Sequence, residues 1–418
     1  MNIGYACLTV GVPHTDQKSC MMKSVSDEKL AQIIAYNLNS LEHIIDYNIK
    51  NNIKLFRISS DLIPFGSSKV NQLPWWDVFS SEFKRIENKI HSSGMRVSMH
   101  PGQYTVLNSP KEEVVERAID DLNYHAKVLD SLHVGPEHKI VLHIGGIYQD
   151  KSEAINRFVA NYSRLQETVK QRLVIENDDK SYNIYDVLEI GKKQSIPVVF
   201  DNLHNKINAY PNGMNEYDWI RECNTTWRKE DGNQKIHYSS QAALKRPGSH
   251  SNSIPIDEFI KFYKGLENSK IDIMLEVKDK NLSAVKCINC TTKNEKVLAL
   301  ELEWSKYKYT VLEHSNANYL AIRRLLRDKK SYPATQFYSL IEEALQEEIV
   351  LGGSINAAQH VWGYFKECTS DKEKEQFLVS LEKFRQGKTS LRTMKNFLWK
   401  LSVKYQQPYL LDSYYFVL

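Results

Sequence analysis

The stretch that decides the fold is LVIENDDKSYNIYDVLEIGKKQSIPVVFDNLH, residues 173–204. It opens with a short apolar run, continues with a segment of helical spacing and closes with a second apolar run. Strand-like runs that alternate with helical segments predict a parallel sheet with helical crossovers. Each run leads into a carboxylate of metal-binding type, Glu176 in the first and Asp201 in the second.

The same pattern recurs along the first two thirds of the chain. Its eight runs are NIGYACL (2–8), KLFRISS (54–60), MRVSMH (95–100), KIVLHIGG (139–146), LVIEND (173–178), VVFDNLH (198–204), KIHYS (235–239) and DIMLEV (272–277). Eight strand and helix units predict a closed (β/α)8 barrel, the TIM barrel of the α/β class, which typically takes about 250 residues. We assign this barrel to residues 1–280.

The rest of the chain has a different composition. The lysine-rich stretch after the last run predicts a linker over residues 281–299, and helical spacing predicts a smaller all-helical domain over residues 300–418. Its segments ELEWSKYKYTVLEHSNANYLAIRRLLRD, NAAQHVWGYFK and LEKFRQGKTSL resemble a small bacterial helical domain of uncharacterised function. Core packing and a solvated basic face explain its aromatic and basic residues, and DNA binding is the alternative. These residues are Trp304, Tyr307, Tyr309, Arg323, Arg324 and Lys329.

Composition is that of an ordinary soluble protein. Hydrophobic residues make up 42% of the 418 residues and charged residues 25%, with a formal net charge of +4. The amino terminus does not have the pattern of a secretory signal, and no apolar run is long enough for a membrane span. The six cysteines are too dispersed for a disulfide framework, and the pair Cys287 and Cys290 lacks a second pair for zinc. We therefore expect a cytoplasmic monomer without a membrane partner.

Side chains that commonly bind metals gather where the predicted strands end. The carboxyl ends of barrel strands meet on one face, so groups far apart in sequence can share one pocket. Burying several unpaired carboxylates would cost several kcal/mol each, and a cluster of cations compensates for that cost. The candidate ligands are His100, His143, Glu176, Asp201, His204, His237, His250 and Glu276.

This set of ligands also indicates a chemistry. Mixed imidazole and carboxylate ligation suits zinc, manganese or iron better than magnesium. Asp201 and His204 lie three residues apart at a turn, which predicts neighbouring ions rather than one. Two such ions can stabilise the attacking and leaving oxygens of a phosphoryl displacement. Lys235, two residues before His237 on the same strand, projects to the same side. It is expected to be a neutral or carboxylated ligand, a phosphate contact, or a solvated lysine at the barrel end.

A set of segments in this order resembles the bacterial and fungal ultraviolet damage endonucleases, metal-dependent barrel enzymes related in architecture to the endonuclease IV class. The segments are GYACL, FRISSDLIPF, MHPGQYTVLNSP, DDLNYHAKVLD, IVLHIGG, LVIENDDKSY, VVFDNLHN, KIHYSS, SHS and IMLEVKDK. The resemblance implies that the eight candidate ligands bind metal and that Lys235 is the family's metal-site lysine. Ser68, in PFGSSK, stands where the family often has a histidine.

The resemblance also implies contacts with damaged DNA. Gln103 and Tyr104 match the residues that probe damaged bases, and Tyr5 matches another residue lining that site. Arg57 and Lys278, both near strand ends, are candidates for phosphate contact. Trp75 and Trp76 either support the probing loop or pack at the barrel rim.

From these residues we predict an endonuclease that binds duplex DNA carrying ultraviolet photoproducts and hydrolyses the phosphodiester 5′ to the lesion. Glu176 and Glu276 would bridge two or three divalent ions, with Lys235 as a third catalytic group. The expected metal is Mn2+, and Zn2+ or another transition metal is the alternative. Two alternatives remain. One is a metal-dependent sugar isomerase or epimerase of the same barrel fold, and the other is a damaged-DNA-binding module without catalysis.

Overall fold

The structure is a computed structural model that describes residues 1–267, 270–293 and 296–418. Contacts divide it into two compact units. The first consists of residues 1–9, 13–254 and 261–288, and the second of residues 10–12, 255–260 and 289–418. Each unit is described by itself.

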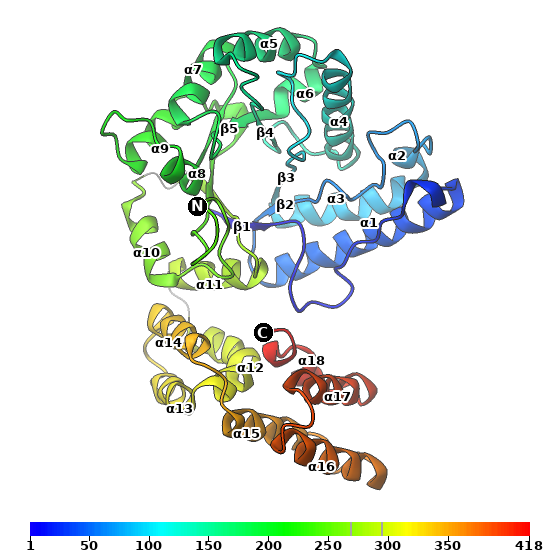
Figure 1. Ribbon diagram of the computed structural model, residues 1–418, viewed down its shortest axis with the longest axis vertical. Coiled ribbons are helices and arrows are strands. Elements are labelled where there is room, and N and C mark those ends of the chain that lie inside the picture. Colours follow the sequence, from blue (N-terminus) through cyan, green and yellow to red (C-terminus); the bar gives the residue numbers. More distant parts are fainter. Residues whose placement is uncertain (268–269, 294–295) are drawn as a thin grey trace. The chain divides into compact units, whose positions relative to one another are not determined.

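The first unit is built on eight parallel strands at the centre of a ring of helices (Figure 1). The strands are β1 (Ile3–Ala6), β2 (Leu55–Arg57), β3 (Arg96–Ser98), β4 (Ile140–His143), β5 (Leu173–Glu176), β6 (Val198–Asp201), β7 (Gln234–Tyr238) and β8 (Ile271–Leu275). Their order in the sheet is β3-β2-β1-β8-β7-β6-β5-β4, and a bridge between Met99 and Ile140 joins the two edges. The predicted TIM barrel is confirmed.

Helices connect the strands as the alternating pattern predicts. They are α1 (Asp27–Lys50), α2 (Trp75–Val78), α3 (Ser80–Ser93), α4 (Glu112–Ser131), α5 (Lys151–Ser163), α6 (Glu167–Arg172), α7 (Ile184–Gln194), α8 (Asn202–Ile207), α9 (Glu216–Asn224), α10 (Ile256–Gly265) and α11 (Asn281–Thr291). Local capping fixes several starts. At α7, Asn183 accepts from the backbone of Asp186, and the Asp186 side chain accepts in return.

The interior of the barrel is layered along its axis. Apolar side chains such as Val141, Val174 and Val199 form one small cluster there. Nearer the amino ends of the strands lies a layer of buried charges, which we call the charged floor. It consists of Arg96 paired with Asp272 at 2.9 Å, Lys139 paired with Asp231 at 2.5 Å, and Lys235. The carboxyl ends of the same strands carry the metal-type side chains.

The second unit is helical, as predicted. Its helices are α12 (Val297–His314), α13 (Asn316–Leu325), α14 (Ala334–Gln346), α15 (Leu351–Trp362), α16 (Asp371–Arg385), α17 (Leu391–Lys404) and α18 (Pro408–Leu411). Tyr307 and Tyr309 are buried in this unit, so neither offers an exposed ring for stacking on DNA. Arg323 and Arg324 are exposed, and Lys329 is paired with Glu301.

The linker predicted over residues 281–299 differs from what the structure has. Residues 281–291 form α11, the helix after the last strand, and α12 begins at Val297. The stretch looked like a linker because polar residues interrupt its apolar ones, but the polar side chains are buried with partners. Lys286 donates to Ser253, and Ser283 donates to Asp279. Residues 294–295 of the predicted linker lie outside the described residues.

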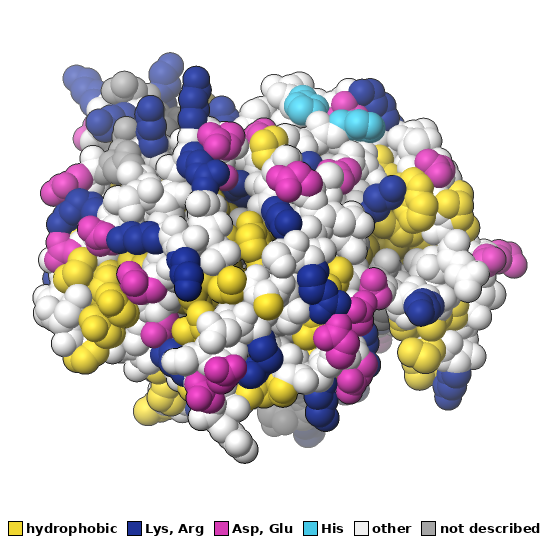
Figure 2. All heavy atoms as spheres, turned by 90° about the horizontal axis from the view of Figure 1, so that it is seen from above, with side chains coloured by type: hydrophobic (Ala, Val, Ile, Leu, Met, Phe, Trp, Pro, Cys, Tyr) yellow, Lys and Arg dark blue, Asp and Glu magenta, His cyan; other side chains and the backbone are white. Residues whose placement is uncertain are grey.

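Three surface properties bear on the predictions. Lys and Arg side chains are mixed with Asp and Glu over most of the face drawn in Figure 2. All six cysteines are free thiols. Within the described residues, no helix combines the length and the apolar character needed to cross a lipid bilayer.

Candidate metal centre at the carboxyl ends of the strands

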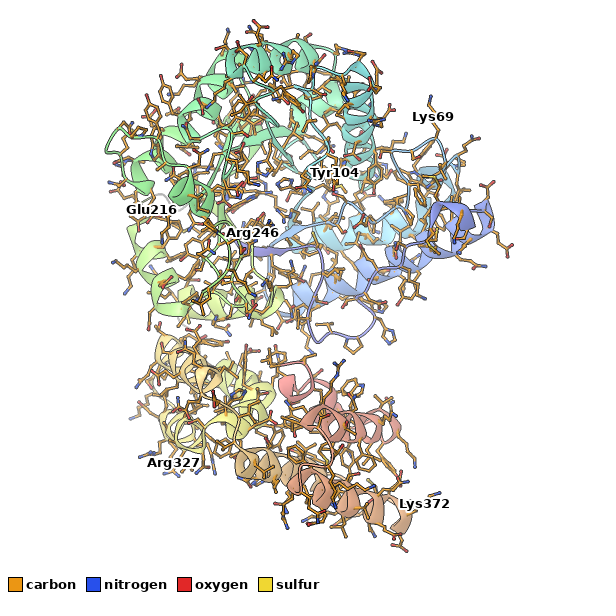
Figure 3. All side chains as sticks on the ribbon, in the orientation of Figure 1. Lys69, Tyr104, Glu216, Arg246, Arg327 and Lys372 are labelled. Carbon is orange, nitrogen blue, oxygen red and sulfur yellow. The ribbon has the colours of Figure 1, made fainter. Side chains whose placement is uncertain are left out.

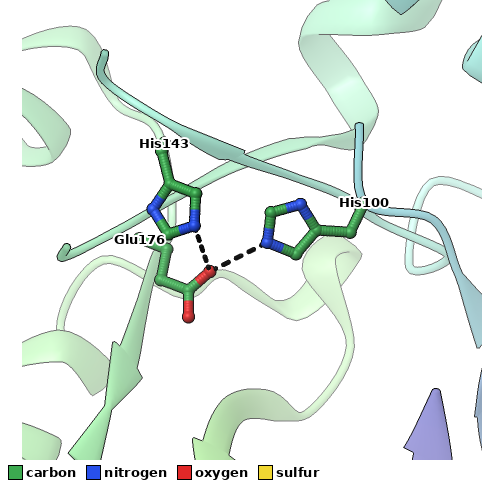
Figure 4. Close-up of side chains that lie close together, drawn as sticks. All are labelled: His100, His143 and Glu176. Carbon is green, nitrogen blue, oxygen red and sulfur yellow. Dashed lines mark hydrogen bonds and ion pairs between the residues drawn. The ribbon is translucent and has the colours of Figure 1, made fainter. Parts of the chain in front are cut away.

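Glu176, the last residue of β5, is the centre of the site. Its Oε2 lies 3.2 Å from Nε2 of His100 and 3.6 Å from Nε2 of His143, so both rings are directed at one carboxylate oxygen (Figure 4). His143 ends β4, and His100 follows β3. The donor atoms of these three residues lie within 4.8 Å of one another, which suits a single metal ion.

A second group shares Glu176. The donor atoms of Glu176, Asp201 and His237 also lie within 4.8 Å of one another. Nδ1 of His237 donates to Oε1 of Glu176 at 2.7 Å. Two buried atoms of this group, Oδ2 of Asp201 and Nε2 of His237, have no hydrogen-bond partner. Buried polar atoms normally find a partner, so a bound ion is a natural explanation for these two.

Glu276 and His250 extend the cluster on the side of β8. Oε2 of Glu276 lies 3.7 Å from Nε2 of His250, and Oε1 lies 3.3 Å from Nδ1 of His237. Arg57, at the end of β2, forms a hydrogen-bonded ion pair with the same Oε1. Arg57 is thus occupied by a carboxylate of the site. It orients Glu276 and leaves the Oε2 atom on the side of His250.

Two asparagines that the sequence reading missed hold the strand ends in place. Asn177 accepts from the backbone N–H of Asp201 at 2.9 Å and donates to its carbonyl at 3.1 Å. Asn202 makes the same pair of bonds with the backbone of Ser239, at 2.8 and 3.0 Å. Each asparagine follows a ligand candidate directly. The only signal in the sequence is this adjacency, in END and FDN.

His204 lies beside Asp201 and takes its orientation from the backbone. Its Nδ1 donates to the carbonyl of Asn177 at 2.9 Å, so Nε2 is the nitrogen left for a ligand or substrate. Its ring centroid lies 5.6 Å from that of His143. The predicted neighbours His204 and Asp201 therefore face different parts of one cluster.

Burial and mutual charge set the protonation of the cluster. Burial lowers the pKa of His100 to about 4. Burial raises the pKa of Glu176, but the charges of His237 and His143 outweigh it, and the net pKa is well below the usual value. For His204, burial lowers the pKa, but the negative charges of Asp201, Glu176 and Glu276 outweigh burial and raise the pKa to about 9. The lowered pKa keeps the Glu176 carboxylate ionised, which favours a bound cation.

Lys235 lies in the charged floor and not among the donor groups named above. Its side chain is fully buried, and Nζ has no hydrogen-bond partner. Burial, followed by the positive charge of Arg96, holds its pKa well below the usual value. The solvated-lysine interpretation is excluded by this burial, and so is an exposed phosphate contact.

A cavity of about 640 Å³ adjoins the cluster. The loop after β3 forms one wall with Gln103 and Tyr104, and residues 178–181 with His204 form another. Gln103 is exposed, and Tyr104 is 83% exposed. The predicted probing residues therefore extend from the mouth of the barrel, next to the donor groups. Lys278, after β8, is exposed as well.

The prediction for Tyr5 is wrong. Its ring is fully buried against Phe56, and its hydroxyl donates to Asn48 of α1 at 2.8 Å. Along β1 the side chains alternate between the two faces, and Ala6 takes the interior face with Leu55 and Met274. Tyr5 therefore packs between the sheet and α1, where it cannot touch DNA.

Two further expectations concern the segment after β2. Ser68 accepts from the backbone of Val70 at 3.3 Å and stabilises a turn. Trp75 is buried, which favours a packing role over support of the probing loop. Trp76 is partly exposed, and the ammonium of Lys127 lies 4.4 Å from its ring centroid.

Comparison with known proteins agrees with this geometry. Residues 1–305 match the family model described as UV-endonuclease UvdE, and residues 308–418 match a protein family of unknown function, DUF1722. The UV DNA damage endonuclease of Clostridium perfringens is 39% identical, over 99% of both chains. That of Bacillus cereus strain B4264 is 32% identical, over 64% of this chain and 85% of its own. The crystal structure of SacUVDE is 39% identical, with a TM-score of 0.66, and the match covers 69% of this chain and 97% of that one. The chain belongs to the UV-endonuclease UvdE family.

Proposed function

We propose that this protein is a metal-dependent endonuclease that acts on duplex DNA carrying ultraviolet photoproducts. Two groups of donor atoms that share Glu176 carry the proposal. In the second group, buried atoms of Asp201 and His237 have no hydrogen-bond partner. The name UV DNA damage endonuclease, borne by the relatives, supports the substrate. Cleavage on the 5′ side of the lesion follows from the family resemblance alone.

The donor set fits divalent ions with mixed nitrogen and oxygen ligation. His100, His143 and Glu176 would hold one ion, and Glu176, Asp201 and His237 a second. His204, His250 and Glu276 offer donors for completing these sites or for a third. Such ions, Mn2+ or Zn2+ by ligand type, would supply Lewis acidity and an activated water for phosphodiester hydrolysis.

The residues around the donors have their own tasks. Asn177 fixes the end of β6, so that Asp201 and His204 diverge toward different parts of the cluster. Arg57 fixes Glu276 and offsets its charge. Gln103 and Tyr104 would enter the duplex at the lesion, where weakened stacking lowers the cost of extruding nucleotides.

Lys235 is a proposed catalytic group of a different kind. Burial lowers the pKa of this unpaired amine and so favours its uncharged form, and an uncharged amine can react with carbon dioxide to form a carbamate with release of a proton. Either the amine or the carbamate would serve the site without a buried positive charge. Incubation with isotopically labelled bicarbonate, followed by carbon NMR, distinguishes the two states.

The function is tested by nicking of supercoiled plasmid, irradiated or not, with manganese, magnesium or chelator. We expect metal-dependent nicks confined to irradiated DNA, with 3′-hydroxyl and 5′-phosphate ends mapping 5′ to the lesions. Glu176→Gln should abolish nicking while lesion binding is retained. Glu189→Gln, a matched change at an exposed position of α7, should leave both unchanged.

Each rival function has its own outcome in this assay. Tight lesion binding without nicking in any metal would favour the non-catalytic module. The absence of both binding and nicking, with sugar isomerisation detected in its place, would favour the isomerase. Nicking by Glu176→Gln at the rate of the parent would overturn the role of the shared carboxylate.

A further inference from the structure

Two large apolar side chains are more exposed than any other in the described part of the chain. Leu244 is 105% exposed and Tyr104 is 83% exposed, whereas the next, Met21, is 65% exposed. Tyr104 lies in the loop after β3, and Leu244 lies in the loop between β7 and α10. Both loops follow the carboxyl ends of strands, so both belong to the mouth of the barrel.

A single exposed leucine on a surface needs no explanation, but the backbone around Leu244 is held in place. The Gln241 side chain accepts from the N–H of Gly248 at 2.9 Å and donates to the carbonyls of Ala242 and Arg246, each at 3.0 Å. The N–H of Ala242 donates to the carbonyl of Ser249 at 2.7 Å. These bonds tie the two ends of a short loop together, and Leu244 lies between them on the exposed part of the loop.

Leu244 also has a left-handed backbone, with φ of +57°. This conformation is disfavoured for a bulky L-residue, and glycine or asparagine would adopt it at lower cost. The chain therefore keeps a leucine at a position where both hydration and backbone preference oppose it. A partner outside the protein would offset both costs.

The loop stands against the cavity of the candidate site. Gln241 and His250 form an antiparallel bridge at its base, so a ligand candidate anchors it. A Cβ built on Gly248 would lie 2.9 Å from Oδ2 of Asp179, which lines the cavity. Figure 3 labels Tyr104 and Arg246, and both lie within the ring of barrel helices in that view.

Charge next to Leu244 suits a polyanion. Lys245 and Arg246 follow it directly, and both are exposed. In DNA-binding proteins, an apolar side chain that enters between base pairs unstacks and kinks the duplex, and neighbouring cations bind the phosphates. A loop with one exposed leucine and two cations has the composition of such a wedge.

We propose that the Leu244 loop is a second DNA wedge, separate from Gln103 and Tyr104. Leu244 enters the base stack at a second step of the duplex, and Lys245 and Arg246 contact phosphates. The inference rests on the proposed function, because it takes duplex DNA as the ligand. It makes lesion recognition depend on two insertions at the rim of one cavity.

The test is the affinity of Leu244→Ala for two lesion duplexes in the full-length protein. One duplex is fully paired, and in the other the base pairs at the lesion and at the steps flanking it are mismatched and already unstacked. We expect about tenfold weaker binding to the paired duplex and binding within about twofold of the parent to the mismatched one, because there the cost of unstacking is already met. The control is Ile49→Ala, an exposed aliphatic residue near the end of α1, at the amino-terminal face of the barrel. It should bind both duplexes like the parent.

Two more measurements separate a wedge from a damaged loop. Manganese affinity should be unchanged in Leu244→Ala, because His250 remains at the base of the loop. Fluorescence of 2-aminopurine near the lesion should rise on binding of the parent and stay lower with the variant at saturation. Arg246→Ala should reduce the slope of log affinity against log salt by about one.

Several results would overturn the wedge. Equal losses on both duplexes, unchanged affinity for the paired duplex, or weakened manganese binding would each contradict it. If the parent nicks irradiated plasmid and Leu244→Ala binds like the parent, the wedge fails while the function stands. If the parent neither binds nor nicks lesion DNA, both fail.

Discussion

Replacing Arg96 by methionine should destabilise the barrel far more than the same change at Arg85. The guanidinium of Arg96 lies in the charged floor, 8% exposed, and pairs with Asp272 at 2.9 Å. It also donates to the carbonyls of Glu137, Asn233 and Asp231 at 2.6–2.8 Å. Removing it leaves a buried carboxylate and three buried carbonyls without this donor. Breaking a buried pair from one side costs about 3–5 kcal/mol.

Arg85 is the matched control because it also pairs with a carboxylate, Glu42, but at the surface. Its guanidinium lies 3.2 Å from the carboxylate, and the side chain is 50% exposed. Surface pairs contribute below about 1 kcal/mol. Arg85→Met should therefore change the free energy of unfolding of the barrel only slightly.

Hydrogen exchange of the amides of β3 and β8 measures the stability of the barrel without interference from the helical unit. We expect the slowest amides of Arg96→Met to exchange faster by the factor that corresponds to the loss in the free energy of unfolding. Changing Asp272 to leucine in the same chain should recover part of the stability, since the unpaired charge is then gone. Similar exchange rates in Arg96→Met and Arg85→Met would refute the assignment of the floor as a buried charge layer.

Three further predictions concern the candidate site and the buried position of Tyr5. Tyr5→Ala should lower the free energy of unfolding by about 3–5 kcal/mol and leave lesion affinity per folded molecule unchanged, whereas Tyr104→Ala should do the reverse, as denaturation and DNA titration will show. Arg57→Met should weaken manganese binding by roughly 10–100-fold in calorimetry, since Glu276 loses the partner that orients it; unchanged affinity would contradict that role. In metal-free protein the pKa of His204 is raised to about 9, so its stabilising contribution is complete below its unfolded pKa and is lost as pH rises through about 9. Thermal unfolding of chelated protein across that interval should show the decline, and a flat profile would contradict it.

Much of the barrel and of the cluster of candidate ligands could be predicted because both follow simple periodicities. A buried parallel strand appears as a short apolar run, and its last inward residue lies two positions beyond the previous inward one. Val174 and Glu176 illustrate this on β5, and Val199 and Asp201 on β6. Since parallel strands end on one face, the position of the candidate ligands at the strand ends was enough to predict a single cluster.

The errors occurred where these periodicities are short or ambiguous. In IGYA the strand is too short to reveal which face is inward, and the resemblance alone assigned Tyr5 to the site. In α11 the buried polar residues broke the apolar pattern, because their partners, such as Ser253 for Lys286, lie elsewhere in the chain. The ion pair between Arg57 and Glu276 joins residues 219 positions apart, and no local pattern marks it.

The pairing between β3 and β4, the seam that closes the barrel, is limited to a single bridge. β7 and β8 are in register over five residue pairs and β4 and β5 over four, but β3 meets β4 only through Met99, with its N–H donating to Lys139 and its carbonyl accepting from Val141. Directly beyond this seam lie the Tyr104 loop and the start of the cavity wall after β4. We therefore expect the barrel to open more readily at this seam than between β7 and β8. Opening at this seam would widen the cavity and leave the pairing of β5, β6 and β7, the strands of Glu176, Asp201 and His237, unchanged.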